Sequence, residues 1–204
     1  MYEKGIIEKI ILFWFGKLDK SGIPSKEKQI MWWSKDHKLD EFIKENYEKY
    51  VNLAVLGELG EWKEDPLGML AFIIVLDQFS RNIYRDTLKA FTQDELALES
   101  AKEGIEKGFY KKLLPIERIF FYLPFMHSEN LEDQQECIRI YRELADECSS
   151  NPDIYSIINN SYEFAIKHFD IIKKYGRYPH RNSIMGRKST AQEIEFLKQE
   201  GSSF

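Results

Sequence analysis

Three short segments of the sequence carry residue types that could bind an anion or move a proton. They are LDQFSRNIYRD (residues 76–86), FYLPFMHSEN (121–130) and YGRYPHRNSIMGRKST (175–190), named here the Asp–Arg segment, the His–Glu segment and the arginine loop. In each segment, polar groups break the surrounding pattern of apolar core and polar surface. Polar groups in such places have either a structural or a functional reason.

The Asp–Arg segment ends the most apolar stretch of the chain. Asp77 and Arg81 are four residues apart, as are Gln78 and Asn82, so each pair lies on one face of a helix. In one interpretation the charged pair caps the negative end of the helix, and in the other it contributes to a site. Because a desolvated ion pair costs stability unless it is fully hydrogen-bonded, we expect this pair at the edge of the core.

The His–Glu segment follows an apolar helix that contains a proline. His127 and Glu129 stand two residues apart, so Glu129 could orient the imidazole for acid–base chemistry. In the alternative interpretation, Ser128 or Asn130 caps the next helix and Glu129 complements its positive end. A metal site made of His127, Glu129 and His180 would lack the HxxxH or HxxH spacing that fixes ligand geometry, so we expect neither a metal nor a cofactor.

The arginine loop gathers positive charge in a protein whose net charge is −5. No acidic residue occurs between Asp170 and Glu193, a stretch that contains Lys173, Lys174, Arg177, His180, Arg181, Arg187 and Lys188. Arginine binds carboxylate or phosphate through two parallel hydrogen bonds, and a helix that begins at Thr190 would point its amides at the loop. The loop is therefore an anion site, or else a basic loop that pairs with acidic groups of the same chain.

Hydrophobic spacing predicts helices along nearly the whole chain and no strand. The expected helices cover residues 3–15, 25–33, 39–54, 65–79, 92–107, 115 onward, 130–148, 151–175 and 190 onward. Ser25 is expected to cap the second of these helices, and Asp65 and Pro66 are expected to begin the fourth. TQDE and TAQE predict capping boxes at Thr92 and Thr190, and Pro124 is expected to kink or stop its helix near Tyr122. The prediction is one all-α domain, residues 1–204, with about eight or nine helices, of which the apolar helix 65–79 is central.

The remaining features favour a soluble, unsecreted, cytoplasmic protein. The acidic net charge excludes general nucleic-acid binding, and no apolar run is long enough to cross a membrane. Cys137 and Cys148 lie roughly 16 Å apart on one helix, too far for a disulfide, and both are expected to face inward.

We expect His168 at the edge of the core, bonded to a backbone carbonyl, and His37 on the surface. Trp32, Trp33 and Trp62 are expected in the core or in a groove wall. The sequence indicates no particular oligomeric state.

Four longer motifs, LGELGEW, LDQFSRNIYRDTLKAFTQDELAL, ERIFFYLPFMHSENLEDQ and GRYPHRNSIMGRKSTAQEIEFL, resemble the bacterial and plant domain-of-unknown-function family 924 along nearly the whole chain. The resemblance implies an antiparallel helical array similar to tetratricopeptide-repeat proteins, although no repeat is readable, and it implies no established activity. Ser80 departs from the family, in which proline is usual. The family motifs fall on Asp77, Gln78, Phe79, Arg81, Asn82, Tyr84, His127, Ser128, Glu129, Gly176, Arg177, Pro179, His180, Arg181, Asn182, Gly186, Arg187 and Thr190.

The leading hypothesis is that the three segments converge on one polar pocket for a small ligand that carries phosphate or carboxylate. His127 or His180 would move a proton while Glu129 or Asp77 orients it, and the ligand would be held by Gln78, Arg81, Asn82, Arg177, Arg181, Asn182, Arg187 and Thr190. Hydrolysis or proton transfer is the natural reaction class, because the sequence has no cofactor fingerprint or Walker-type loop. The alternatives are a tetratricopeptide-like module that grips a peptide carboxylate in a basic groove, and a purely structural polar network.

Overall fold

Helices account for the regular structure of the chain. The computed structural model describes residues 5–202, so residues 3 and 4 of the first expected helix lie outside the described residues. The elements are α1 (Ile6–Phe15), α2 (Lys26–Trp33), α3 (His37–Val55), α4 (Pro66–Ile74), α5 (Ser80–Ile83), α6 (Asp94–Glu106), α7 (Pro115–His127), α8 (Leu131–Glu147), α9 (Pro152–Tyr175) and α10 (Ala191–Phe196). Because α4 and α5 form one continuous rod, the described residues contain nine separate α-helices and no strand. The predicted all-α fold is confirmed.

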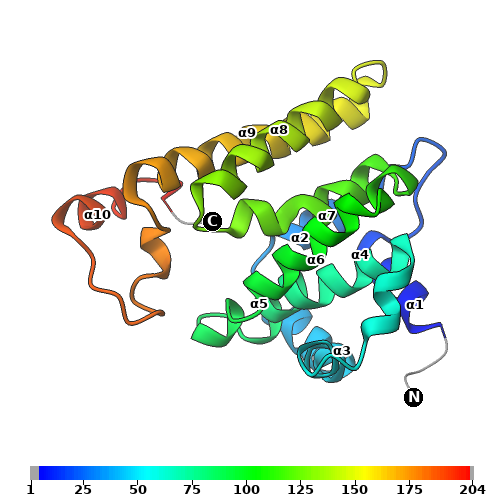
Figure 1. Cartoon of the computed structure of the whole chain (residues 1–204), viewed down its shortest axis with the longest axis horizontal. Helices are drawn as coiled ribbons and strands as arrows, with labels where there is room; N and C mark the ends of the chain where they lie inside the picture. Colours follow the sequence, from blue (N-terminus) through cyan, green and yellow to red (C-terminus); the bar gives the residue numbers. More distant parts are fainter. Residues whose placement is uncertain (1–4, 203–204) are drawn as a thin grey trace.

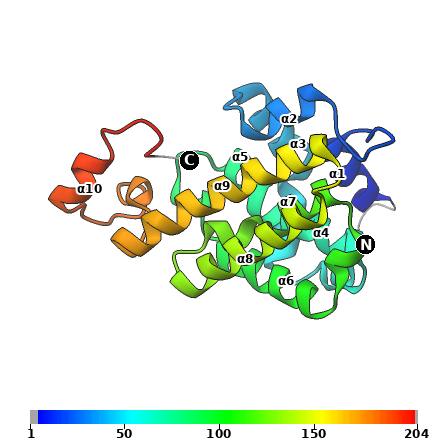
Figure 2. The same cartoon turned by 90° about the horizontal axis from the view of Figure 1, so that it is seen from above.

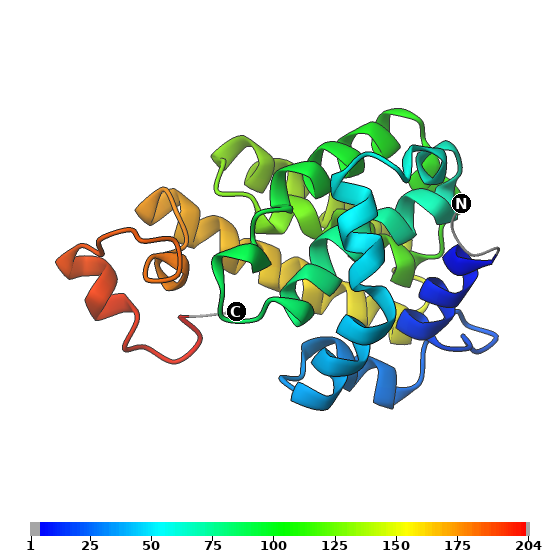
Figure 3. The same ribbon diagram turned by 90° about the horizontal axis from the view of Figure 1, so that it is seen from below.

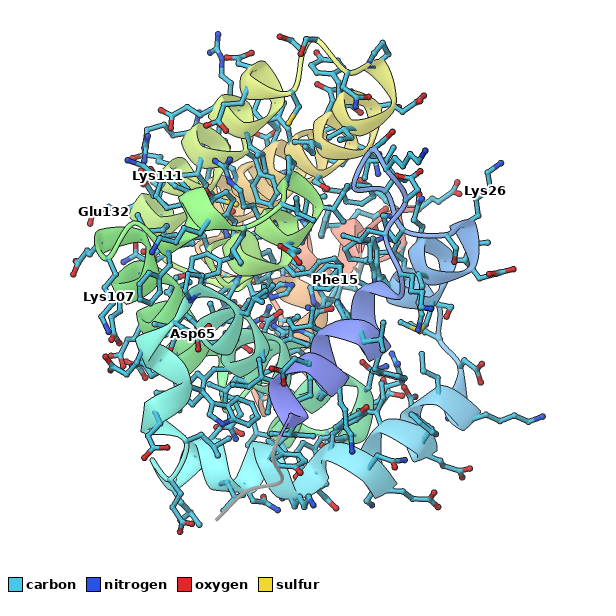
Figure 4. All side chains as sticks on the ribbon, turned by 90° about the vertical axis from the view of Figure 1, so that its right-hand side faces the viewer. Phe15, Lys26, Asp65, Lys107, Lys111 and Glu132 are labelled. Carbon is cyan, nitrogen blue, oxygen red and sulfur yellow. The ribbon has the colours of Figure 1, made fainter. Side chains whose placement is uncertain are left out.

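The helices are arranged in layers around α4. Figure 1 shows α8 and α9 side by side along one edge and α3 at the opposite edge, with α4, α6 and α7 between them. Figure 2 shows α9 running over this body, with α10 projecting at one end. In Figure 3, α3 crosses the front of the molecule. The layers bury Phe15, which lies in the interior in Figure 4, while the labelled Lys26, Lys107, Lys111 and Glu132 lie at the periphery.

The central position of α4 follows from its sequence, as predicted. Asp65 caps the helix by accepting hydrogen bonds from the amides of Leu67 and Gly68, and Pro66 occupies the first turn. Every residue from Met69 to Ile74 is at most 3% exposed. A Cβ on Gly68 would lie 2.2 Å from the carbonyl oxygen of Trp62, so only glycine allows the preceding turn to pack this closely.

A π-helical turn, η2 (Val75–Phe79), joins α4 to α5. The turn brings Asp77 and Gln78 into the core, where they are 1% and 8% exposed. Helices adopt π turns rarely, and frequently at functional sites. The apolar rod therefore places a carboxylate and an amide inside the molecule where its regular geometry changes.

The predicted capping box at Thr92 is wrong. The chain between α5 and α6 forms a short 3₁₀ turn, η3 (Leu88–Ala90), and the hydroxyl of Thr92 donates to the carbonyl oxygen of Lys89 at 3.1 Å. Helix α6 begins only at Asp94, and Gln93 precedes it without a side-chain cap. Because the preceding turn extends further than the sequence indicates, Thr92 is part of that turn rather than the start of the helix.

The prediction that Pro124 stops its helix near Tyr122 is wrong, because α7 continues through this residue to His127, while a kink at Pro124 stays a prediction. The carbonyl groups at the end of α7 find side-chain donors instead. Gln134 donates to the carbonyl oxygens of Phe125 and Met126 at 3.2 and 2.9 Å, and the hydroxyl of Tyr178 donates to Met126 at 2.6 Å. These bonds satisfy carbonyl groups that the end of a helix leaves without an intrahelical donor.

Most other local predictions are confirmed. Ser25 caps α2, and Thr190 and Glu193 form the capping box of α10. Cys137 and Cys148 are buried and free. Trp32 and Trp62 lie in the core, whereas Trp33 is 62% exposed and stacks on Phe120, so the core location is wrong for Trp33 and its place in a groove wall stays a prediction. Within the part of the chain that the structure describes, none of the helices combines the length and the apolar character needed to span a bilayer.

Ser80 provides a test of the packing around the π turn. Its hydroxyl is fully buried and has no hydrogen-bond partner among the described residues. Ser80→Ala is therefore expected to raise the free energy of unfolding by about 1 kcal/mol, measured by urea denaturation. Ser100→Ala is the matched control, since this equally buried hydroxyl donates to Leu96 at 2.8 Å, and its removal should bring no gain. Equal effects of the two substitutions would contradict the explanation.

Candidate functional site

The three segments meet at one end of the helical body, in the left half of Figure 1, where α5, the end of α7 and the loop after α9 lie near one another. A chain of contacts joins them, and we name it the central network. Its members are Asp77 and Arg81 from the Asp–Arg segment, His127 from the His–Glu segment, Arg181 from the arginine loop, and Asp94 from the start of α6.

Asp77 lies at the inner end of the central network. Its Oδ1 is 2.6 Å from Nδ1 of His127 and 3.1 Å from Nη1 of Arg81, while Gln78 donates to its Oδ2. Burial alone raises the pKa of Asp77, but the charge of Arg81 and the contact with His127 hold this pKa well below its ordinary range. The carboxylate is therefore ionised and can fix the orientation of the imidazole.

His127 reaches toward solvent from Asp77, with 15% of its side chain exposed. Burial and the positive charge of Arg81 lower its pKa, against the opposing effect of Asp77, so the ring is neutral at pH 7. A neutral ring whose Nδ1–H donates to the ionised Asp77 has an unprotonated Nε2. That nitrogen can accept a proton, which is the chemistry of a general base.

Two guanidinium groups converge on Asp94. Nη1 of Arg81 is 3.0 Å from Oδ1 of Asp94, and Nη2 donates to Oδ2 at 3.1 Å. From the other side, Nη1 of Arg181 donates to the same Oδ2 at 3.0 Å. The ring of Phe91 lies 4.6 Å from the guanidinium carbon of Arg181 and 5.8 Å from that of Arg81. We name the two guanidinium groups of Arg81 and Arg181 that face Asp94 the arginine fork.

Glu129 does not contact His127 through any described hydrogen bond. Its carboxylate accepts two hydrogen bonds from Arg187, at 2.5 and 2.9 Å, and a third from the amide of Tyr178 at 2.7 Å. Nε of Arg187 also donates to Oδ1 of Asn182 at 2.9 Å. Glu129, Arg187 and Asn182 therefore fasten the arginine loop to the end of α7, while Asp77 is the carboxylate in contact with His127.

Two further histidines lie at the arginine loop, His180 within it and His168 on α9. Nδ1 of His168 is 2.8 Å from the carbonyl oxygen of Phe164, as predicted, and burial lowers its pKa to about 3. Burial and the charge of Arg181 lower the pKa of His180 to about 4. Both rings lie 5.6 Å from the ring of Tyr178. The interior of the site thus contains neutral imidazoles next to the arginines.

Besides Arg187 and Asn182, three more predicted ligand-binding residues make their contacts away from the central network. Asn82 donates to Asp40 on α3 at 2.8 Å. Arg177 binds both oxygens of Glu193, at 2.7 and 2.8 Å, and Thr190 completes the cap of α10. The structure therefore brings together Asp77, Gln78, Arg81, His127 and Arg181, and places Asn82, Arg177 and Thr190 at helix-fastening contacts nearby.

Sequence reasoning missed two acidic residues that decide the geometry. Asp94 lies inside the TQDE motif, whose predicted capping box gave this residue no role. Asp40 also stands at the start of a helix, yet it is 9% exposed and accepts two hydrogen bonds from Arg85, both at 2.7 Å. The available signal was the excess of arginine in the three segments, which requires acidic partners somewhere in the chain.

Among residues 5–202, no group of three or more His, Cys, Asp or Glu side chains could hold a metal ion, so the alternative trio of His127, Glu129 and His180 does not form one. An open hollow of about 730 Å³ lies along α3, away from the predicted site residues, and its lining consists of Glu41, Lys44, Glu45, Glu48, Lys49 and Asn52.

Comparison with known proteins gives a family and a structural relative. The model of the family described as bacterial protein of unknown function (DUF924) matches residues 10–201. The structure of the protein of unknown function ATU0120 from Agrobacterium tumefaciens is similar, with a TM-score of 0.79 and 30% sequence identity, over 95% of this chain and 97% of that chain. Among curated proteins, none matches the chain.

Proposed function

Since the chain belongs to the DUF924 family of bacterial proteins of unknown function, we propose a function from the chemistry of its site alone. The protein binds a small ligand that carries phosphate or carboxylate at the arginine fork, with His127 as the proton acceptor for hydrolysis or proton transfer. The observation that carries this proposal is the convergence of Arg81 and Arg181 on one carboxylate beside the Asp77–His127 pair.

The arginine fork is suited to an anion that arrives from solvent. The side chains of Arg81, Asp94 and His127 are 20%, 17% and 15% exposed, so the network reaches the surface although Asp77 is buried. Guanidinium groups bind two oxygens of one anion through parallel hydrogen bonds. Arg181 is buried and stacks between Phe91 and Tyr178, which fixes its orientation before any ligand arrives.

His127 supports a reaction rather than binding alone. A proton acceptor is effective when a second group fixes its tautomer, and Asp77 contacts Nδ1 of His127 at 2.6 Å. The site has no serine or cysteine in hydrogen-bond contact with this ring among the described bonds. Activation of a water molecule for attack on a bound phosphate or carboxylate ester therefore fits the residues better than a covalent intermediate.

Thermal unfolding in the presence of inorganic phosphate or acetate tests the binding step. A bound anion at a hundredfold excess over its dissociation constant stabilises the folded state by about 2.7 kcal/mol. Arg181→Ala should remove this stabilisation. Arg118→Ala is the matched control, because Arg118 is equally buried and also pairs with a carboxylate, that of Glu147, far along α7 from the fork.

A second measurement tests the reaction. Wild-type protein should hydrolyse p-nitrophenyl phosphate or p-nitrophenyl acetate, and His127→Gln should lose this activity while it still binds the anion. Binding of peptides with a free C-terminal carboxylate, without binding of small anions, would favour an interaction module instead. An absence of any anion binding that depends on Arg181 would leave a structural polar network as the function of these residues.

A further inference from the structure

Asp94 occupies the arginine fork in the way an anionic ligand would. Both of its carboxylate oxygens face guanidinium nitrogens, with three nitrogen–oxygen distances of 3.0 to 3.1 Å. It comes from a different element than either arginine, the first residue of α6. Within the described residues, these guanidinium groups are its only hydrogen-bond donors at the side chain, so the fork alone holds the carboxylate.

The fit between Asp94 and the fork is incomplete. Oδ1 of Asp94 is buried and close to Arg81, but no donor is aligned for a hydrogen bond to it. Nε of Arg181 is likewise buried and has no acceptor among the described residues. Arg181 as a whole is 6% exposed. Buried polar atoms normally find partners, so a donor and an acceptor left without them in one fork indicate a place that a carboxylate does not fill completely.

We propose that Asp94 is an internal placeholder for the ligand, and that the natural ligand is a small phosphate-bearing molecule whose phosphate displaces the Asp94 carboxylate from the arginine fork. This inference rests on the proposed function and adds the ligand class and a means of self-inhibition. A phosphate offers more acceptor oxygens than a carboxylate, enough to reach Nε of Arg181 as well as the three nitrogens that Asp94 contacts.

Displacement rather than addition follows from the charges. The two arginines of the fork already face two carboxylates, those of Asp77 and Asp94. A phosphate placed beside Asp94 would meet a like charge within a few ångströms in a site that is largely shielded from solvent, which disfavours its binding. Asp77 is buried and held by His127 and Gln78, so it cannot leave.

Asp94 is able to leave without disruption of α6. Its side chain is 17% exposed and stands at the first residue of the helix, where a rotation about its own side-chain bonds turns the carboxylate toward solvent. In that position it still lies near the positive end of α6, whose first turn has no side-chain cap from Gln93. The start of α6 therefore keeps a favourable negative charge whether Asp94 binds the fork or faces solvent.

Isothermal titration with inorganic phosphate and with acetate tests the inference on the full chain. If Asp94 fills the fork nine-tenths of the time, its removal should lower the apparent dissociation constant for phosphate by about tenfold. Asp94→Asn and Asp94→Ala should both show this gain, and addition of Arg181→Ala to either should abolish it. Two variants are used so that a folding defect in one of them, seen by circular dichroism, leaves the other to decide the question.

Asp133→Asn is the matched control, since this carboxylate is 12% exposed and pairs with Lys102 and Ser128 near the His–Glu segment, outside the fork. It should leave the phosphate affinity unchanged. If phosphate binding depends on Arg181 but is not strengthened in either Asp94 variant, the proposal that Asp94 is a placeholder is wrong. The proposed anion site at the fork would then still stand. A larger gain for acetate than for phosphate would overturn the ligand class. No binding of either anion to wild type or variants would overturn both proposals.

Discussion

Replacement of Asp77 by alanine is expected to lower the free energy of unfolding by about 3–5 kcal/mol, because it leaves buried charge and hydrogen-bond donors without their partner. Asp77 is 1% exposed and interacts with Arg81, His127 and Gln78 at the same time. Its removal would leave Arg81 with Asp94 as its remaining carboxylate partner. Urea denaturation followed by circular dichroism at pH 7 measures the change.

Glu136→Ala provides the comparison for this substitution. Glu136 also pairs with an arginine, accepting hydrogen bonds from Nε and Nη2 of Arg139, but this pair lies on the exposed surface of α8. Exposed ion pairs contribute little to stability because water and salt screen them, so this variant should unfold at nearly the wild-type urea concentration. If Asp77→Ala lowered the free energy of unfolding no more than Glu136→Ala, the buried contacts of Asp77 would not stabilise the fold more than an exposed ion pair does.

Acidification from pH 7 to pH 5 is expected to lower the free energy of unfolding by about 4 kcal/mol. Burial lowers the pKa of His168 to about 3 and that of His180 to about 4. In the unfolded chain both rings bind protons below a pKa of about 6.5, while in the folded protein they stay neutral. Protons therefore favour the unfolded state, and each ring removes about 2 kcal/mol between pH 7 and pH 5, with a slope that approaches about 1.4 kcal/mol per pH unit only below the unfolded pKa.

The histidine effect can be separated from that of the carboxylates. Asp77, whose pKa is lowered, contributes stability that is lost only as the pH falls below about 4, the ordinary pKa of an aspartate. Urea denaturation of His168→Gln at pH 7, 6 and 5 should show about half of the wild-type loss. His37→Gln, at the exposed start of α3, should lose as much stability as wild type. A free energy of unfolding that stays constant between pH 7 and pH 5 would refute the prediction.

The sequence was sufficient for the fold and for the neighbourhood of the site, because both depend on local patterns. Asp65 and Pro66 mark the start of α4, and the apolar run behind them requires burial. Polar residues within or just after apolar helices, such as Asp77 and His127, are visible as exceptions to that pattern. Similarity to tetratricopeptide-repeat proteins and the single-domain boundary both remain predictions.

The pairing of charges could not be predicted, because it depends on contacts between distant parts of the chain. Arg181 pairs with Asp94, 87 residues away, and the sequence offers 34 acidic residues as candidate partners. Glu129 was expected to orient His127 because the two are neighbours in sequence, but its partner is Arg187, 58 residues away. Helix packing selects among such partners, and hydrophobic spacing does not encode that choice.

The π turn between α4 and α5 also determines how the chain responds to a change in length. Such a turn accommodates one residue more than a regular α-helix would, and loss of one residue from a helix rotates everything after it by about 100°. Deletion of Leu76, within η2, would therefore leave an uninterrupted apolar helix but turn Arg81 away from Asp94 and Asn82 away from Asp40. The polar contacts of Arg81 and Asn82 with other elements therefore depend on the longer register.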